Sequence, residues 1–509
     1  MIYFLNDNIQ DKKSGIEHAQ IKRLNLFNQF KVPAKIVTRQ SSTSLHTVTN
    51  AAGIDDSQLI NLFDYFQETM DFETKKIRIQ NLKINSDWKR EPEGDSYNYY
   101  RNNNRIMYVH RDSDKRVTNA QYFDHFGKLL KVEWYDDRGF ISIEHVYDWT
   151  SKIATENFMR PDGSIAIQKS RLLDKRGKEV ESYHLFNYKG QDYQFANFDE
   201  LTSFFYDQLV IDGDINDGQY PVFIVDRSYE LGWAVLHMQN PVYKAFQLHN
   251  SHLNDVNDLM NSSLNYNYAY GLNHFDNWDA VISLTSQQDA DMKVRYNTDH
   301  TKLFQIPGPI VPKKTLEATH VDFKKRKPYS VIMVARLSPE KQQDHLVRAW
   351  KKIHEKLPQA TLDLWGYENG EFGKQIKQQV DDAKLSNSIK FRGYTTDIAQ
   401  VYDEAQLTVL PSRSEGLPLA LVEAQSHGMP IVANDIKYGP ADVVVDGKDG
   451  YLTKNGDVDG LADAIIKALS DQDQLAKFSE QAYIDSARYS EENVMKKWQV
   501  LLDDVKEEH

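Results

Sequence analysis

The chain has 509 residues, a length at which a single core gives way to two or three domains. Its hydrophobic share of 40% and charged share of 27% are those of a folded soluble protein, which excludes a disordered chain. The formal net charge of −13 disfavours generic binding to nucleic acid or to an anionic membrane, because like charges repel. The sequence has no cysteine, so disulfides, thiolate metal sites and a cysteine nucleophile are excluded.

The first residues do not resemble an export signal. The segment from Met1 to Asp7 turns polar after four apolar residues and lacks the basic flank and long apolar run of a signal peptide. The longest apolar stretches, such as Tyr329 to Leu337, have only the length of a strand, so we expect no membrane span. We therefore expect a cytoplasmic protein, with a peripheral position at the inner face of the membrane as the alternative.

The first forty residues have the pattern of a parallel sheet covered by helices. Ile2 to Leu5 is a short apolar run that predicts a buried strand. A loop ending at Ser14 and Gly15 leads to a predicted helix from Glu17 to Phe30, and a second strand is predicted from Ala34 to Val37. This strand, loop, helix and strand order is typical of α/β proteins.

The pattern changes between residues 98 and 195, where helical periodicity is weak. Short apolar runs alternate with turn signals such as Asp136 to Gly139 and Pro161 to Gly163, spaced by about one hairpin each. We predict an antiparallel meander inserted into the first lobe, without a strict sequence repeat. Because exposed edges of such sheets pair readily, we expect homo-oligomerisation through this insert, with acceptor binding as its other possible role.

The α/β pattern then resumes with three apolar runs that predict strands, at Pro221–Val225, Ala234–His237 and Ala280–Leu284. Further strands are predicted at Ser330–Ala335, Thr361–Trp365, Ile389–Phe391, Leu407–Leu410 and Ile431–Ala433. Helices are predicted between them at Gln342–Lys356, Gly373–Ala383, Ile398–Ala405 and Leu419–His427. Strict alternation predicts a doubly wound parallel sheet, in which ligands bind beyond the carboxyl ends of the strands.

Two cations follow the first strand of this second lobe. Arg336 and Lys341 stand five residues apart beside the start of a helix. A forked guanidinium and an ammonium group at a helix N-terminus favour the binding of a diphosphate. A surface salt-bridge pair is the alternative interpretation.

Glycines and glutamates follow the other strands. Gly366, and Gly393 with Tyr394, stand where a backbone can approach a ligand closely, although each glycine alone is also consistent with an ordinary turn. A more specific segment begins at Glu415 and ends at Glu423. Its loop residues Gly416 and Leu417 precede a predicted helix. A carboxylate such as Glu423 is suited to accept both vicinal hydroxyls of a ribose, whereas two helical glutamates without a function are the alternative.

Together, Gly15, the Arg336 and Lys341 pair, the Glu415 to Glu423 spacing and the segment Asp435 to Pro440 resemble a known family. They resemble retaining glycosyltransferases of family 4, which have two Rossmann-like lobes (the GT-B fold). The closest likeness is to a bacterial branch with a β-rich insert in the first lobe. That branch modifies serine-rich or serine-aspartate-repeat adhesins, or wall teichoic acid. The resemblance covers essentially the whole chain and is strongest from 330 to 455.

The resemblance implies a role for each candidate residue. Arg336 and Lys341 would bind the diphosphate of a UDP-sugar, Glu423 its ribose, and Glu415 the sugar that is transferred. His249 would be the catalytic histidine of the cleft, with a core or capping histidine as the alternative. The remaining substrate-binding candidates are Ser14, Gly15, His252, Gly366, Gly393, Tyr394, Gly416 and Leu417.

No metal or other cofactor is predicted, since the UDP-sugar is a co-substrate. No Asp-x-Asp motif stands where a metal would neutralise a diphosphate, and Asp289 and Asp291 fall in a predicted helix. An amphipathic helix is predicted from Glu491 to Glu508, crossing back to the first lobe.

Five segments are expected. They are the first part of the N-terminal acceptor lobe (1–97), the inserted meander (98–195), the second part of that lobe (196–312), the UDP-sugar-binding lobe (313–490) and the C-terminal helix (491–509).

The function that the resemblance implies is transfer of a hexose, with GlcNAc favoured over Glc, from a UDP-sugar to serine hydroxyls of a repetitive cell-surface adhesin. The α-glycosylation of wall teichoic acid polyol-phosphate is the alternative. A non-catalytic partner of such an enzyme is an alternative of another class, but inactive homologues lack the donor-site residues that this chain keeps.

Overall fold

The computed structural model describes residues 1–213, 220–368 and 370–508. The chain divides into two compact units. The first contains Met1–Glu17 and Pro33–Lys244, and the second contains His18–Val32 and Ala245–His509. This division does not follow the five predicted segments, whose bounds stay a prediction.

The first unit contains a parallel sheet in the strand order β14-β1-β2-β3. Its strands are β1 (Ile2–Asn6), β2 (Ala34–Thr38), β3 (Leu59–Asn61) and β14 (Val222–Val225). Helix α1 (Gly15–Gln29) connects β1 to β2, which confirms the predicted strand, loop, helix and strand order. Most of α1, from His18 onward, is assigned to the second unit. The helices of the first unit are α2 (Leu45–Ala51), α3 (Leu62–Phe66), α4 (Phe198–Asp212) and α5 (Ser228–Leu236).

One predicted strand of this region is wrong. Ala234 to Leu236 forms the last turn of α5, and the strand that follows it is β15 (Tyr243–Gln247). A short buried apolar run has no periodicity that distinguishes a strand from a buried helix segment. Ala234 and Val235 are completely buried, so their hydrophobicity reports burial and not strand geometry.

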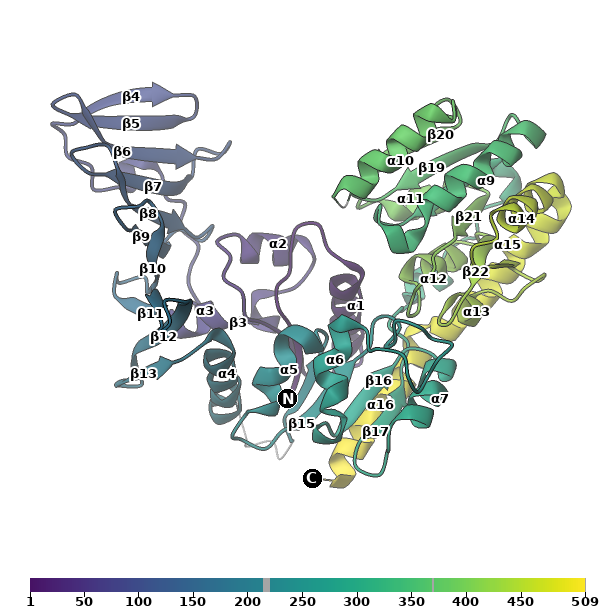
Figure 1. Ribbon diagram of the computed structural model, residues 1–509, viewed down its shortest axis with the longest axis horizontal. Helices are drawn as coiled ribbons and strands as arrows, with labels where there is room; N and C mark the ends of the chain where they lie inside the picture. Colours follow the sequence, from purple (N-terminus) through teal and green to yellow (C-terminus); the bar gives the residue numbers. More distant parts are fainter. Residues whose placement is uncertain (214–219, 369, 509) are drawn as a thin grey trace. The chain divides into compact units, whose positions relative to one another are not determined.

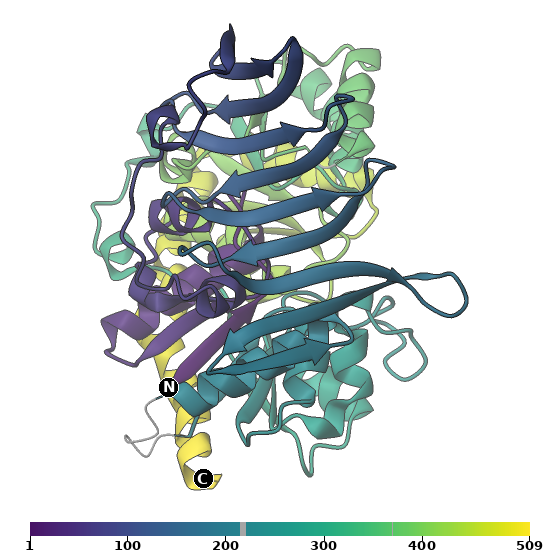
Figure 2. The ribbon, with the colours of Figure 1, turned by 90° about the vertical axis from the view of Figure 1, so that its left-hand side faces the viewer.

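The insert is a ten-stranded antiparallel sheet in which each strand pairs with its neighbours in the chain (Figure 2). The sheet confirms the predicted meander. It begins at Lys89, so its first strand and the start of its second fall in the segment that was predicted to precede the insert. The strands are β4 (Lys89–Glu93), β5 (Ser96–Arg101), β6 (Asn104–Arg111), β7 (Val117–Phe123), β8 (Leu129–Tyr135), β9 (Ile141–Tyr147), β10 (Ile153–Met159), β11 (Ile165–Leu173), β12 (Glu179–Tyr188) and β13 (Gln191–Phe195).

The turns of this sheet repeat, although the sequence shows no strict repeat. Turns closed by a hydrogen bond from the backbone N–H of residue i to the carbonyl of residue i+4 begin 12 residues apart at Asp112, Asp124, Asp136, Asp148 and Arg160, and another begins at Asp174. At all of these positions except Arg160, an aspartate carboxylate accepts hydrogen bonds from the turn's own backbone, much as in an Asx turn. The repeated unit is therefore one strand and one turn.

A buried charge network joins one of these turns to the residues around α2 and α3. Arg138 donates to Asp136 at 2.8 Å and to Asp64 of α3 at 2.5 Å. His46 of α2 contacts the other oxygen of Asp64 at 2.9 Å and contacts Asp56 at 2.8 Å. The network therefore fixes one turn of the insert to the part of the unit that carries the parallel sheet.

We expect this network to make the stability of the protein depend on pH. Burial alone would lower the pKa of His46, but the hydrogen bonds and negative charge of Asp64 and Asp56 outweigh it and raise that pKa. A histidine with a raised folded pKa stabilises the fold below its unfolded pKa of about 6.5, and this contribution is lost as the pH rises through the folded value.

The melting temperature should consequently fall as the pH is raised from 6 to values above the folded pKa of His46. The His46→Gln variant should melt at a lower temperature at pH 6 and lose this dependence. Thermal unfolding of both proteins across pH 6 to 9 checks the expectation, and identical pH profiles would contradict it.

The second unit contains the parallel strands β17-β16-β15 and a six-stranded parallel sheet in the order β20-β19-β18-β21-β22-β23. Its strands beyond β15 are β16 (Ala280–Ser283), β17 (Lys302–Gln305), β18 (Ser330–Val334), β19 (Thr361–Trp365), β20 (Ile389–Gly393), β21 (Leu407–Leu410), β22 (Ile431–Asp435) and β23 (Gly450–Lys454). All five strands predicted for the second lobe are confirmed; β23 was not predicted.

Helices cover both faces of the six-stranded sheet (Figure 1). They are α9 (Gln343–Lys356), α10 (Glu371–Asp382), α11 (Ile398–Glu404), α12 (Leu419–Ser426), α13 (Pro440–Val443), α14 (Val458–Ser470) and α15 (Gln472–Ser486). Successive residues of β18 alternate between the two faces: Val331 and Met333 pack in one core cluster and Ile332 in the other. This alternation is why the strand is apolar throughout.

The predicted C-terminal helix forms α16 (Glu491–Glu508). Its Trp498 is buried and lies edge-on to Phe27 of α1, with ring centroids 5.5 Å apart. The last helix of the unit therefore packs against a helix from the start of the chain. Among the described residues, no helix is both long enough and apolar enough to cross a membrane.

Candidate active site

The carboxyl ends of the central strands of the six-stranded sheet bring two charged loops together. Lys341 ends a short 3-10 turn (Pro339–Lys341) after β18, and Glu415 lies in the loop after β21. The Lys341 ammonium donates to a Glu415 oxygen at 2.5 Å. Only 18% of the Lys341 side chain and 8% of the Glu415 side chain are exposed, so this ion pair is shielded from water.

Arg336 lies at the exposed side of the same loop. Its guanidinium donates to Glu340 at 2.6 and 3.1 Å, and the hydroxyl of Ser338 donates to the same oxygen at 2.6 Å. Burial would raise the pKa of Glu340, but the hydrogen bond from Ser338 and the charge of Arg336 lower it, so Glu340 is ionised. Nearly half of the Arg336 side chain remains exposed, which leaves donors available to an anion.

Glu423 lies on α12 and makes an ion pair that the sequence did not indicate. The Lys22 ammonium of α1 donates to Glu423 Oε1 at 2.5 Å. The two residues are 401 positions apart, so no local pattern connects them. Arg336, Lys341, Glu415 and Glu423 are thus all engaged in ion pairs: Arg336 with Glu340, Lys341 with Glu415, and Glu423 with Lys22.

The loop of Glu415 touches the segment of His249. A Cβ added to Gly416 would lie 2.6 Å from the His249 carbonyl oxygen and 2.7 Å from the Leu284 side chain, so only glycine fits. The hydroxyl of Ser414 also donates to the Asn250 side chain at 3.1 Å. His249 and Glu415, both predicted for the site, are therefore on segments in direct contact.

This contact predicts the effect of a single methyl group. The Gly416→Ala variant must move the Glu415 loop away from His249 by about 1 Å, and a misplacement of that size costs about 100-fold in catalysis. We expect kcat/KM of the reaction at this site to fall by about that factor. The control is Gly456→Ala, at a glycine with open space around it but with φ 85°, which should lose some stability and keep its activity. Equal activities of the two variants would contradict the prediction.

His252 is completely buried beside Tyr438, with the two rings stacked at 5.9 Å. Within the described part of the chain, neither ring nitrogen has a hydrogen-bond partner. Burial lowers the pKa of His252 to about 4, so the ring is neutral at pH 7. The Tyr438 hydroxyl in turn donates to Asp291 at 2.8 Å, and Lys437 pairs with the same oxygen at 3.1 Å. His252 therefore packs against the segment that contains Lys437 and Tyr438.

The other candidates differ in what they contact. Gly366 has φ 141°, and a Cβ there would meet the Ala335 carbonyl oxygen at 2.1 Å. The absence of a side chain at Gly366 therefore lets the ends of β18 and β19 lie close together. Gly393 faces open space and Tyr394 is partly exposed. Leu417 is buried in the core of the unit. Binding roles for these four residues stay a prediction.

Ser14 and Gly15 belong to the first unit. The backbone N–H of Ser14 donates to Glu17 at 2.5 Å, and Arg227 donates to the Ser14 hydroxyl at 3.3 Å. Their part in binding a donor stays a prediction.

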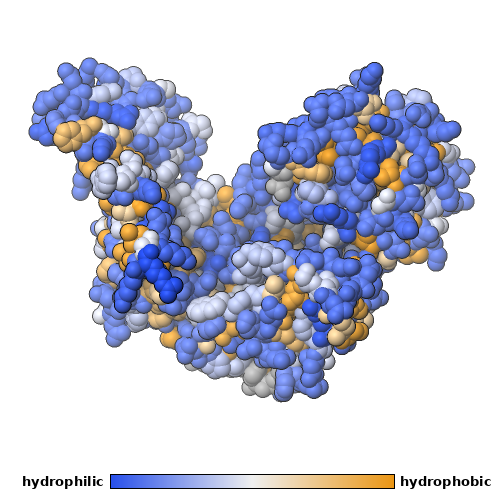
Figure 3. Space-filling view, in the orientation of Figure 1, coloured by the Kyte–Doolittle hydropathy of each residue, from blue (hydrophilic) through white to orange (hydrophobic). Residues whose placement is uncertain are grey.

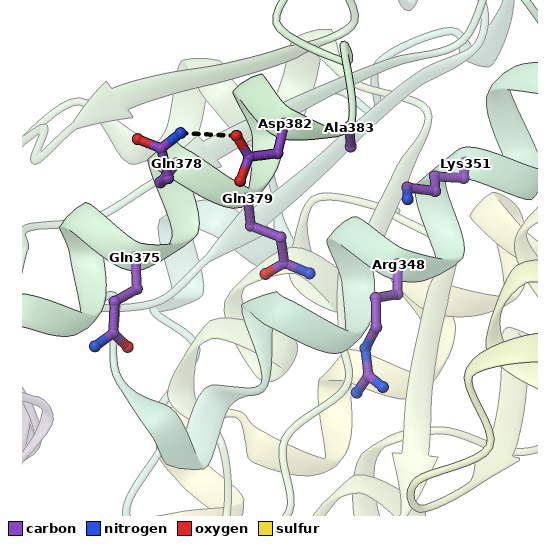
Figure 4. A pocket seen from close by; sticks show the side chains of 7 residues that line it. All are labelled: Arg348, Lys351, Gln375, Gln378, Gln379, Asp382 and Ala383. Atoms are coloured by element: carbon purple, nitrogen blue, oxygen red, sulfur yellow. Dashed lines mark hydrogen bonds between the residues drawn. The ribbon is translucent and has the colours of Figure 1, made fainter.

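Possible metal ligands and a surface pocket are two features to compare with the positions of the charged loops. Among the described residues, no group of three or more histidine, aspartate and glutamate side chains could hold a metal ion. Asp289 and Asp291 lie on α7 (Ser286–Arg295), as predicted. Figure 4 shows a polar pocket between α9 and α10, and none of the candidate residues lines it. Its lining residues are Arg348, Lys351, Gln375, Gln378, Gln379, Asp382 and Ala383.

A doubly wound sheet with cations and carboxylates at the carboxyl ends of its strands is the arrangement in which α/β proteins bind ligands. Residues 317–485 match the family described as glycosyl transferases group 1.

Relatives match along the whole chain. The poly(glycerol-phosphate) alpha-glucosyltransferase of Bacillus subtilis (strain 168) is 24% identical over 519 residues, covering 99% of this chain and 75% of the relative. The GtfA subunit of the UDP-N-acetylglucosamine–peptide N-acetylglucosaminyltransferase of Streptococcus gordonii is 25% identical over 523 residues, covering 100% and 99%. The crystal structure of the pneumococcal O-GlcNAc transferase GtfA in complex with UDP and GlcNAc superposes with a TM-score of 0.82 at 21% identity, covering 99% and 98%. This likeness confirms the predicted fold class, with two Rossmann-like lobes and an antiparallel insert.

Proposed function

We propose that the protein is a UDP-sugar-dependent retaining glycosyltransferase that moves a hexose to serine hydroxyls of a repetitive bacterial cell-surface adhesin. GlcNAc is the favoured sugar and Glc the alternative. The observation that carries the proposal is the shielded Lys341–Glu415 pair at the strand ends of a glycosyl transferases group 1 domain. Relatives named for transfer from UDP-N-acetylglucosamine to peptide, matched over the full chain, support the donor and the acceptor.

The charges of the site suit the chemistry of this reaction. As the bond between sugar and diphosphate breaks, negative charge grows on the departing phosphate, and fixed cations stabilise that charge. Arg336 and Lys341 would supply these cations, while Glu415 would contact the transferred sugar. The leaving phosphate can itself accept the proton of the acceptor hydroxyl, so no separate protein base is required. We propose that no metal takes part.

Wall teichoic acid is the second candidate acceptor, and the full-length match to a poly(glycerol-phosphate) alpha-glucosyltransferase favours it. The net charge of the whole chain, −13, is unfavourable for a polyphosphate acceptor, which like charges repel. On the sheet of the insert, two lysines are each paired with two glutamates, Lys131 with Glu133 and Glu144, and Lys169 with Glu156 and Glu181. These two lysines are therefore neutralised by carboxylates of the chain itself.

Mass spectrometry of transfer reactions tests the choice of acceptor. Purified protein is incubated with UDP-GlcNAc or UDP-Glc and with either a serine-aspartate-repeat peptide or purified teichoic acid. Hexose on the peptide with one donor would support the proposal. Hexose on teichoic acid alone would reverse the acceptor and keep the donor site.

We further propose a cytoplasmic homo-oligomer assembled through the insert of residues 98–195. Figure 3 shows hydrophobic side chains at the surface of this sheet among hydrophilic ones. Phe126 and Trp149, in the turns after β7 and β9, are 86% and 82% exposed. Light scattering should give a mass of at least a dimer, and the Phe126→Ser/Trp149→Ser variant should be smaller. A monomeric wild-type protein would contradict this proposal.

A further inference from the structure

The ion pair between Lys22 and Glu423 lies at the residue to which ribose binding is assigned. Lys22 is on α1, two turns after Gly15, and Glu423 is on α12. Both residues belong to the second unit, and their charged atoms are 2.5 Å apart. The side chains are 25% and 30% exposed, so a ligand in solution can reach the carboxylate while the pair is formed.

A buried tyrosine lies near the Glu423 carboxylate. Tyr402 of α11 is completely buried and donates to the Ala420 carbonyl oxygen at 3.3 Å. Burial, followed by the negative charge of Glu423, raises the pKa of Tyr402 well above its ordinary value, so the tyrosine stays protonated. The hydrogen-bonded ion pair with Lys22 therefore restricts the orientation of the carboxylate.

A carboxylate has about four acceptor positions on its two oxygens. The ammonium group of Lys22 leaves positions free for the two vicinal hydroxyls of a ribose. Exposed ion pairs contribute little to stability, typically below about 1 kcal/mol, so stability gives no sufficient reason for this pair. The neighbouring cation Arg23 differs, because it is buried and bonded to Gln247 inside the unit.

We infer that Lys22 is a positioning residue of the donor site, which fixes the Glu423 carboxylate for the ribose hydroxyls of the nucleotide. The inference rests on the proposed function, because it assumes a UDP-sugar donor. Lys22 also offsets the negative charge of Glu423, which would otherwise repel the diphosphate of the same ligand. Its loss should therefore weaken UDP binding and also weaken the selection of ribose over deoxyribose.

Calorimetric titration with UDP and with 2′-deoxy-UDP tests the inference on the full-length protein. The wild type should prefer UDP by roughly tenfold or more, the discrimination expected from a hydrogen bond between a hydroxyl and a charged group. In Lys22→Met the preference should fall to less than about threefold, and UDP itself should bind roughly tenfold more weakly. Lys22→Arg should retain most of the preference, because it restores the charge. The matched control is Lys293→Met, which removes the ammonium of another ion pair of the same unit, with Asp289.

The outcomes separate the inference from the proposed function. If Lys22→Met binds UDP and prefers it over 2′-deoxy-UDP as strongly as the wild type does, or more strongly, the role of Lys22 is overturned. The proposed donor site would remain. No UDP binding by the wild type would instead contradict the proposed function. If Lys22→Met fails to fold, Lys22→Gln replaces it in the test. The inference is then supported if the preference for UDP over 2′-deoxy-UDP is lost in Lys22→Gln and kept in Lys22→Arg.

Discussion

Replacing Lys341 with alanine should lower kcat/KM for sugar transfer by roughly 100- to 1,000-fold, the loss expected when one fixed charge at a developing anion is removed. The Lys341 ammonium is the more shielded of the two site cations, and its interaction is least weakened by water. The change also leaves Glu415 without its cation in a buried position, which adds negative charge where the diphosphate would lie. The rate of UDP release from the sugar donor, with acceptor present, is the measurement.

The control is Lys374→Ala, which removes a lysine from an exposed ion pair with Glu371 on the same sheet's helix α10. It should retain wild-type kcat/KM. Melting temperatures of both variants separate a loss of catalysis from a loss of fold. A Lys341→Ala protein that melts like the wild type and loses less than tenfold activity would contradict the assignment of Lys341.

Replacing Arg138 with alanine should destabilise the first unit by about 3–5 kcal/mol, the cost of removing one partner from a buried ion pair. Arg138 is bonded to Asp64 and Asp136, and the two carboxylates are less than a tenth exposed. Without the guanidinium, both negative charges would remain in a poorly hydrated place. Chemical denaturation with a fluorescence signal from the insert measures the change.

Arg116 offers a matched control, since it bonds to Asp112 in another turn of the same sheet but is 29% exposed. Arg116→Ala should cost below about 1 kcal/mol, as exposed ion pairs do. If both variants lost a similar free energy of unfolding, the buried network around Asp64 would contribute no more to stability than the more exposed pair.

The sequence was sufficient to predict the second lobe because its signals are local. The strands from Ser330 to Asp435 have four or five residues each, and the helices after β18 and β19 are longer and amphipathic, so length and periodicity separate the two kinds of element. The chemistry followed from the same order, because ligands bind beyond the carboxyl ends of parallel strands. Arg336, Lys341 and Glu415 do lie in the loops at those ends.

Other features depend on contacts between distant residues and left no local signal. Lys22 gains its place at Glu423 only through the packing of α1, 401 positions away. Gly416 is required by the backbone of His249, which no spacing in the sequence reveals. The segment Ala234 to His237 was assigned to a strand because burial makes a helix equally apolar.

The repeated turns of the insert were missed for another reason. They share a hydrogen-bonding pattern and mostly an aspartate, but the strands between them vary freely. Only the 12-residue spacing of the turns from Asp112 to Arg160 could have revealed the repeat.

The central claim is that the chain transfers a hexose from a UDP-sugar through the site at Lys341 and Glu423. The most direct test measures UDP formation from UDP-GlcNAc by wild type and Glu423→Ala, with a serine-rich repeat peptide present and peptide mass recorded. The account predicts that UDP and glycosylated peptide appear together with the wild type and are strongly reduced with the variant. A wild-type protein that neither binds nor consumes UDP-sugars with any of the acceptors would contradict it, and would favour a non-catalytic partner of such an enzyme.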